Sequence, residues 1–306
     1  MVIVAGKGGV GKTTVTAALA RMAASEGLDT LIVEIEGKGG LAALFDRPPL
    51  DYEESILWPR AAGHGEVRGR TLTPDDALLE YLDDHGMKRV SKRLVSSGAL
   101  DVVATAAPGI KDILILGKVK QLEQKGVADL ILIDAPAAGH AITFLLAARA
   151  LLDTVKVGPI NTQAQEVVEL LGDPTRTQVV LVTLPEETPV NELVETAFNL
   201  EDRVGVSLGP VVVNGLYPEL DGIEVDPAQA ASDAGTSLRA GEAEALKAAA
   251  EFRMRRTALQ RQQLDRLAEK LPLPQLRLPF LFRADLGSDE VEVLADALRV
   301  SVEALP

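Results

Sequence analysis

One stretch near the amino terminus, VIVAGKGGVGKTT at residues 2–14, constrains the fold more than any other part of the chain. It reads as a short apolar strand, a glycine-rich turn and the start of a helix, and four residues separate Gly6 from Gly11-Lys12-Thr13, which is the spacing of a phosphate-binding loop. Glycines let backbone N–H groups close around phosphates with no Cβ in the way, and the helix that begins near Thr13 adds its N-terminal dipole. The alternative is a strand, turn and helix whose glycines occur by chance.

The loop predicts a site for the polyphosphate of a nucleotide together with Mg²⁺. We expect Lys12 to reach the β- and γ-phosphates and the hydroxyl group of Thr13 to bind Mg²⁺. The rest of the loop is expected to surround the phosphates, through Gly6, Gly8, Gly9, Val10, Gly11 and Thr14.

Composition argues against several classes of function. A net charge of −14 disfavours a nucleic-acid partner and an anionic membrane surface, because both are bound by basic surfaces. The chain has no cysteine, which excludes disulfides, thiolate nucleophiles, cysteine zinc sites and iron–sulfur ligation, so we expect no zinc. We also expect no signal peptide, since Met1 stands directly on the first strand, and no spanning helix, since no uncharged apolar run reaches about 18 residues. These features are typical of a cytoplasmic protein.

Alternating strand and helix patterns predict an α/β fold. Thr30 to Glu34 is a second buried strand, so that a strand, a helix and a strand form a parallel βαβ unit. Further strands are expected at residues 66–72, 129–134, 178–183, 210–214 and 276–279, with another possible at 100–104, whereas 47–70 is rich in turn residues. Helices are expected from Thr73 onward and at 111–125, 189–200, 242–271 and 291–302. The sequence therefore predicts a mostly parallel sheet flanked by helices, the P-loop NTPase architecture. We expect one domain over residues 1–306, with helical insertions at about 73–126 and 216–271 that form a helical subdomain.

Asp134 ends the strongly apolar strand DLILID at residues 129–134. An acid at the carboxyl end of a buried strand beside a phosphate loop can order the Mg²⁺ shell through water, so Asp134 is a second predicted metal residue. The alternative is a strand-end acid that caps a turn.

Lys7 makes the loop more specific, because the general pattern requires no lysine after its first glycine. The stretch GKGGVGKTT at residues 6–14 resembles the deviant phosphate loop (deviant Walker A) of the class that contains ArsA, ParA, MinD and the nitrogenase iron protein. The resemblance implies a dimer in which Lys7 reaches the partner's nucleotide and stabilises charge on the transferring phosphoryl group. The alternative is that Lys7 contacts the phosphates of its own subunit.

Two segments resemble the switch loops of the ArsA family. Glu36 matches the aspartate that orients the attacking water in switch I, with a side chain one methylene longer; the alternative is a solvated loop acid. DAPAAGH at residues 134–140 resembles switch II, with Asp, Gly and His in matching positions and Ala138 where the family has threonine. The match implies that Gly139 presents its N–H to the γ-phosphate.

The resemblance extends to the nucleotide base. Asn214, at the end of a strand, resembles the family's adenine-reading asparagine, and an amide suits that task; the alternative is a turn-forming asparagine before Gly215. PFLF at residues 279–282 resembles the loop that forms an apolar wall for adenine, so Pro279 and Phe280 are predicted to contact the base.

The nearest known group is the ArsA-like ATPases of actinobacteria, which occur as adjacent, non-identical pairs. The resemblance implies Mg²⁺-dependent ATP hydrolysis that drives open and closed states of a homodimer, or of a heterodimer with a paralogous ATPase. The family's clients do not carry over to a chain without cysteine and with only four methionines, so the first hypothesis is an ATPase with a protein or membrane-protein client. The arginine-rich helix at 242–271 either faces such a partner or is a solvated face on a core-packed helix. A second hypothesis, motivated by Glu36 and Ala138, is a weakly active or inactive nucleotide-binding regulatory subunit whose partner hydrolyses ATP.

Overall fold

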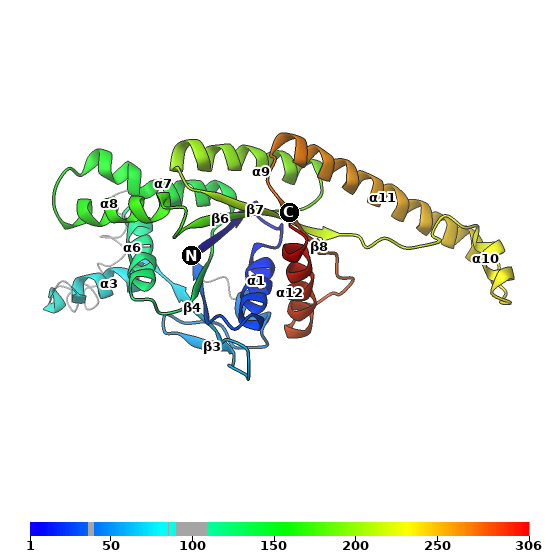
Figure 1. The fold of residues 1–306 in the computed structure, drawn as a ribbon, viewed down its shortest axis with the longest axis horizontal. Helices are drawn as coiled ribbons and strands as arrows, with labels where there is room; N and C mark the ends of the chain where they lie inside the picture. The colour runs from blue at the N-terminus through cyan, green and yellow to red at the C-terminus, as the bar shows by residue number, and fades with distance from the viewer. Residues whose placement is uncertain (36–39, 85, 90–108, 306) are drawn as a thin grey trace.

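A computed structural model describes residues 1–35, 40–84, 86–89 and 109–305 (Figure 1). Its described strands form one sheet with the order β3-β4-β2-β5-β1-β6-β7-β8, in which only the β3–β4 pair is antiparallel. The strands are β1 (Val2–Gly6), β2 (Thr30–Ile35), β3 (Ser55–Trp58), β4 (Val67–Leu72), β5 (Leu130–Asp134), β6 (Gln178–Thr183), β7 (Leu208–Leu216) and β8 (Gln275–Pro279).

Helices cover both faces of the sheet. They are α1 (Lys12–Ser25), α2 (Gly40–Ala43), α3 (Pro74–Asp84), α6 (Ile110–Gln124), α7 (Ala138–Thr154), α8 (Pro159–Gly172), α9 (Glu187–Asn199), α10 (Pro227–Asp233), α11 (Glu242–Lys270) and α12 (Ser288–Glu303), with a π-helical turn η1 (Leu200–Val204) after α9. None of the described helices is both long enough and apolar enough to span a bilayer.

The central strand β1 is buried from both sides, which explains its unbroken apolar sequence. Ile3 and Ala5 pack in the core beneath α6, α7, α8 and α9, whereas Val4 packs with residues of α1 and α12 on the other face. Side chains alternate between the faces of a strand, so a strand covered on both faces needs apolar residues at every position. In Figure 1, α1 and α12 stand side by side beneath the sheet, in agreement with their many mutual contacts.

The predicted fold class is confirmed: the sheet is mostly parallel and flanked by helices. The long helix expected at 242–271 is α11, and α3 and α6 lie in the first of the two expected helical insertions. The turn-rich segment 47–70 contains the short edge strand β3, and α7, α8 and α10 were not predicted. The strand considered at 100–104 lies outside the described residues.

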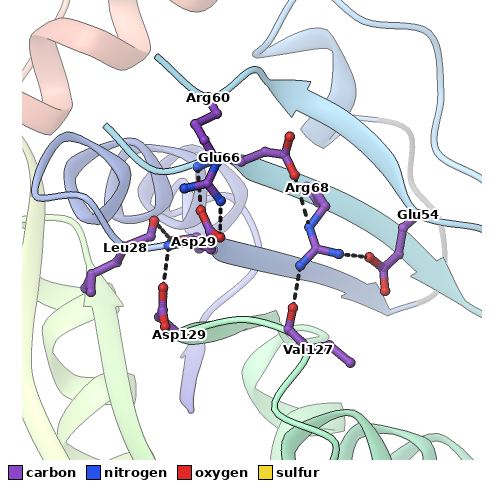
Figure 2. Close-up of polar contacts among 9 residues, drawn as sticks. Leu28, Asp29, Glu54, Arg60, Glu66, Arg68, Val127 and Asp129 are labelled. Carbon is purple, nitrogen blue, oxygen red and sulfur yellow. Dashed lines mark hydrogen bonds and ion pairs between the residues drawn. The ribbon is translucent and has the colours of Figure 1, made fainter. Parts of the chain in front are cut away.

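A polar cluster joins the amino ends of β2, β4 and β5, at the sheet edge opposite the phosphate loop (Figure 2). Asp29 accepts the backbone N–H of Glu66 (N to Oδ1, 3.0 Å) and pairs with Arg60. The N–H of Asp29 donates to Asp129 (N to Oδ2, 2.9 Å). The hydrogen bond from Glu66, and then the one from Arg60, lower the pKa of Asp29 below its ordinary 3.8. The cluster therefore joins three strand starts, with the Asp29 carboxylate linking β2 to β4 and the Asp129 carboxylate linking β5 to β2.

We expect Asp29→Asn to lower the free energy of unfolding by about 1 kcal/mol at neutral pH, because the amide keeps an acceptor but loses the charge. The folded pKa is depressed, so the stabilisation is fully present above the ordinary pKa and is lost as the pH falls through the folded value. Urea unfolding at neutral pH and near pH 3 measures this difference, which should shrink in acid. Asp265→Asn, at an exposed position of α11, is the control. An acid-independent difference would contradict the assignment.

Candidate functional site

The phosphate loop joins β1 to α1 and takes a shape that only glycine permits at two positions. Gly11 caps α1 in the left-handed region (φ 89°), and a Cβ there would lie 2.4 Å from Asn214 Nδ2. A Cβ on Gly6 would lie 2.4 Å from the Val182 carbonyl oxygen. Gly9 also has positive φ (83°), but a Cβ there would meet no atom within 4 Å. The loop is thus held close to β6 and β7 at its two ends and is open in its middle.

This geometry predicts that Gly11→Ala destabilises the fold by about 3 kcal/mol, because the new methyl group adds a clash with Asn214 to the strain of positive φ. Gly9→Ala is the matched control, since it carries the strain alone and should cost about 1 kcal/mol. Urea unfolding measures the loss of stability in each variant, and calorimetry measures the affinity of each variant for ATP. Equal losses of stability would show that Asn214 moves aside freely.

The two predicted metal residues lie together beside the loop. Thr13, in the first turn of α1, donates its hydroxyl to Asp134 (Oγ1 to Oδ2, 2.7 Å), and Asp134 is 7% exposed at the end of β5. The parallel pairing of β1 with β5, in which Val4 stands opposite Asp134, brings the two together. Lys12 extends back over the loop, and its Nζ donates to the carbonyl oxygen of Lys7 at 3.1 Å.

Lys12, Thr13 and Asp134 line a cavity of about 270 Å³. Its lining is Gly8, Gly9, Gly11, Lys12, Thr13, Glu34, Ile35, Asp134, Ala135, Pro136 and Ala137. The cavity has polar donors from α1 and the loop on one side and carboxylates from β2 and β5 on the other. It therefore has the chemistry of a site for a phosphate group and a hard cation.

Glu34 is a lining residue that sequence reasoning did not single out. It is 4% exposed, pairs in register with Asp134, and accepts a hydrogen bond from Thr71 (Oγ1 to Oε2, 2.9 Å). Among the described residues, no group of three or more His, Cys, Asp or Glu side chains is arranged to hold a metal ion. The only signal for Glu34 was an acid near the end of a buried strand.

Lys7 does not point into this cavity. Its ammonium group pairs with Glu192 of α9 (Nζ to Oε1, 2.7 Å), and the two side chains are 40% and 43% exposed. Neither alternative from the sequence included this partner, which comes from the same chain and is 185 positions away. Lys7 thus lies outside the cavity lining, with its side chain partly exposed and directed toward α9.

The residues predicted to contact the base lie at the carboxyl ends of β7 and β8. Asn214 donates to the carbonyl oxygen of Val10 (Nδ2 to O, 3.0 Å), so its amide is bound to the back of the loop. Phe280, just after Pro279, packs against Tyr217 and Phe282, with ring centroids 5.1 and 4.8 Å away. This aromatic group is partly open, since Phe280 is 40% exposed. It offers an apolar face of the kind expected for a base.

Of the two predicted switch residues, Gly139 lies among the described residues. Gly139 is exposed in the first turn of α7, where backbone N–H groups have no partner within the helix and the dipole favours an anion. Its predicted contact with the γ-phosphate is compatible with that place. Glu36 lies outside the described residues.

The family model described as "Anion-transporting ATPase" matches residues 1–161, more than half of the chain. The chain belongs to the anion-transporting ATPase family. The matched part contains the phosphate loop, Asp134 and Gly139, so the resemblance to ArsA-like proteins drawn from the sequence is confirmed. Membership in a family of ATPases implies a nucleotide site.

Several relatives of this family member are similar over much of its length. ATPase BagA of Mycobacterium tuberculosis is 38% identical over 223 residues, which cover 71% of this chain and 65% of BagA. A putative arsenical pump-driving ATPase of Halobacterium salinarum is 26% identical over 306 residues, covering 94% of this chain and 42% of that protein. An arsenical pump-driving ATPase of Escherichia coli is 26% identical over 216 residues, covering 70% and 34%. The chain spans less than two thirds of the length of each.

Proposed function

We propose that the protein is a Mg²⁺-dependent ATPase that acts as a nucleotide-driven dimeric switch on a protein or membrane-protein client. The observation that supports this best is the hydrogen bond between Thr13 and Asp134, placed at a glycine loop whose ends leave no space for side chains. A hydroxyl group and a carboxylate held at this distance beside a helix N-terminus suit a magnesium–phosphate complex.

The residues present fit ATP and Mg²⁺. Lys12 would bind the β- and γ-phosphates, Thr13 would bind Mg²⁺ directly and Asp134 would bind it through water. When bound, Mg²⁺ neutralises charge that develops on the phosphate oxygens during hydrolysis. Asn214 holds the loop from behind, and the aromatic group around Phe280 would face the base.

Hydrolysis needs positioned charge more than proton transfer, so the chain's own residues would act mainly by placement. Lys12 would fix the phosphates from within the subunit, and Lys7 would supply a second positive charge from the partner subunit. Glu36 would orient the attacking water, and the N–H of Gly139 would bind the γ-phosphate. Loss of the γ-phosphate would release both switch segments, which is how a bound nucleotide changes the shape of a dimer.

The composition of the chain argues against arsenite as the client. Relatives are named arsenical pump-driving ATPases, but this chain has no cysteine thiolate to bind arsenite, so we propose no arsenite site. We propose that one domain over residues 1–306 carries the ATPase site and that its helical insertions, at about 73–126 and 216–271, face the partner subunit or the client.

Three measurements on the purified chain test the proposal. We expect calorimetry to show Mg²⁺-dependent binding of ATP and ADP, steady-state assays to show ATP hydrolysis that chelation of Mg²⁺ abolishes, and light scattering to show a dimer with ATP and Mg²⁺. Absence of heat with any adenine nucleotide would remove the proposal entirely. A monomer under all conditions would remove its dimeric part.

Ala138, which has no hydroxyl group where the family has threonine, favours a second candidate function. In this reading the chain binds nucleotide but regulates a paralogous ATPase that performs the hydrolysis. Turnover by the chain alone, abolished in Glu36→Gln while ATP still binds, would contradict it. Turnover only after addition of the paralogue would favour it.

A further inference from the structure

We propose that Glu192 is a positioning residue for Lys7. Its carboxylate holds the ammonium group of Lys7 against α9 of the same chain until α9 moves. The contact that suggests this is direct, with Lys7 Nζ 2.7 Å from Glu192 Oε1. This role presupposes the proposed function, in which Lys7 acts on a nucleotide. It adds a residue that controls when Lys7 is available.

The ion pair between Lys7 and Glu192 is strong enough to favour one position of Lys7 and weak enough to be broken. Both side chains are partly exposed, at 40% and 43%, so solvent screens the attraction. Exposed pairs of this kind change an equilibrium by about two- to fivefold, enough to bias Lys7 toward α9 but not to trap it there. Because Lys7 carries a single charge, it cannot neutralise Glu192 and a distant phosphoryl group at the same time.

The helix that carries Glu192 is tied to α11 at three points. Arg256 of α11 pairs with Glu186, the residue that precedes α9. Arg266 donates to Asn191 (Nη2 to Oδ1, 2.5 Å) and lies 3.7 Å from a carboxylate oxygen of Glu187. Asn191 is the neighbour of Glu192 in sequence, so a shift of α11 would be transmitted directly to the helix that holds Lys7.

The same part of α11 also contacts the predicted base wall. Arg253 lies over the ring of Tyr217, with its guanidinium carbon 4.7 Å from the centroid, and Arg256 lies 5.9 Å from it. Tyr217 in turn packs against Phe280. Arg256 therefore links the phosphate side of the site, through α9, with the base side, through Tyr217.

The rest of α11 is placed so that its movement would shift Arg256 together with the contacts that Arg256 makes. Its carboxyl-terminal half is anchored in the main core by Leu264 and Leu267. No residue from Glu242 to Leu259 is buried. The amino-terminal part of the helix extends away from the sheet as an arm that ends near α10 (Figure 1). A force on the arm would act on Arg256, which lies near the point where the helix joins the body.

The first experiment removes the hold on Lys7. We expect Glu192→Gln to raise kcat by about two- to fivefold at low salt while calorimetric ATP affinity stays unchanged, and Glu192→Asp to restore the wild-type value. Added salt should raise the kcat of the wild type but not that of Glu192→Gln, because salt screens the ion pair. Glu195→Gln, at an exposed position of the same helix, is the control.

The second experiment tests the link to α11. We expect Arg256→Gln to raise kcat in the wild-type background and to have no further effect in Glu192→Gln, because both changes release the same lysine. Arg255→Gln is the control, since Arg255 pairs with Glu251 of its own helix (Nη2 to Oε2, 3.4 Å). Additive effects of Arg256→Gln and Glu192→Gln would overturn the coupling through α9.

A readout independent of hydrolysis separates this inference from the proposed function. The rate at which an amine-reactive reagent labels Lys7, measured by mass spectrometry, should rise in Glu192→Gln and stay unchanged in Glu195→Gln. If labelling and kcat both stay at the wild-type values while ATP binds normally, Glu192 has no positioning role and the ATPase proposal stands. If labelling rises but the wild type binds no nucleotide, the contact is real and the proposed function fails.

Discussion

Replacing Lys12 by alanine is expected to weaken ATP binding on the order of a hundredfold and to remove hydrolysis, with little change in stability. Lys12 lines the cavity, and its Nζ lies over the loop, 3.1 Å from the carbonyl oxygen of Lys7. In the loop it would be the point charge that opposes the β- and γ-phosphates. Calorimetry with ATP and with ADP, each with Mg²⁺, measures the loss, which should be larger for ATP.

Lys125→Ala is the matched control for this variant. Lys125 is exposed at the end of α6 and lies outside the cavity, so its removal changes the net charge equally without touching the site. Thermal unfolding should give similar midpoints for the two variants. A Lys12→Ala protein that binds ATP with wild-type affinity would show that the phosphate loop is not the nucleotide site.

The parts of the site that the sequence predicts are those encoded by local spacing. Gly6, Gly11 and Thr13 stand in a fixed pattern between a strand and a helix, and Asp134 ends a buried strand. Parallel strands present their carboxyl ends at one edge of the sheet, so the meeting of Thr13 with Asp134 follows from the fold class.

The parts that escape prediction depend on contacts between distant segments. Glu192 lies 185 positions from Lys7, and nothing in the composition of α9 marks it from the other acids of that helix. Glu34 is similarly concealed, because a buried acid is tolerated only where a partner such as Thr71 is supplied by a neighbouring strand. Such pairings are properties of the assembled sheet and helices, which a single sequence does not display.

The fold discrepancies have comparable causes. β3 is a four-residue antiparallel edge strand with an irregular register, too short for alternation to emerge within a turn-rich segment. Helix α7 contains the run AITFLLAARALL, which is apolar on most sides, and it packs in the main core through Phe144, Leu145 and Ala148. Its exposed positions include Ala150 as well as Thr143 and Arg149, so polar residues do not form a continuous stripe and the helical period gives little signal.

Replacing Lys7 by alanine is expected to have the opposite kinetic signature to the loss of Lys12. ATP affinity should remain within a few-fold of the wild type, since Lys7 points toward Glu192 and not into the cavity, while kcat falls on the order of a thousandfold. Steady-state hydrolysis together with calorimetry separates the two parameters. Equal losses of affinity and of kcat would place Lys7 on the phosphates of its own subunit.

Mixing two inactive variants tests whether Lys7 acts across a dimer. In a homodimer that pairs Lys7→Ala with Lys12→Ala, the first subunit binds ATP and the second supplies Lys7 to it. Random pairing at equal concentrations leaves one complete site in half of the dimers, so about a quarter of the wild-type turnover should return. If Lys7 served its own subunit, the mixture would stay inactive, because every bound nucleotide would lack the second lysine. Recovery of turnover on mixing is therefore expected only from a lysine that leaves Glu192 and crosses to the partner subunit.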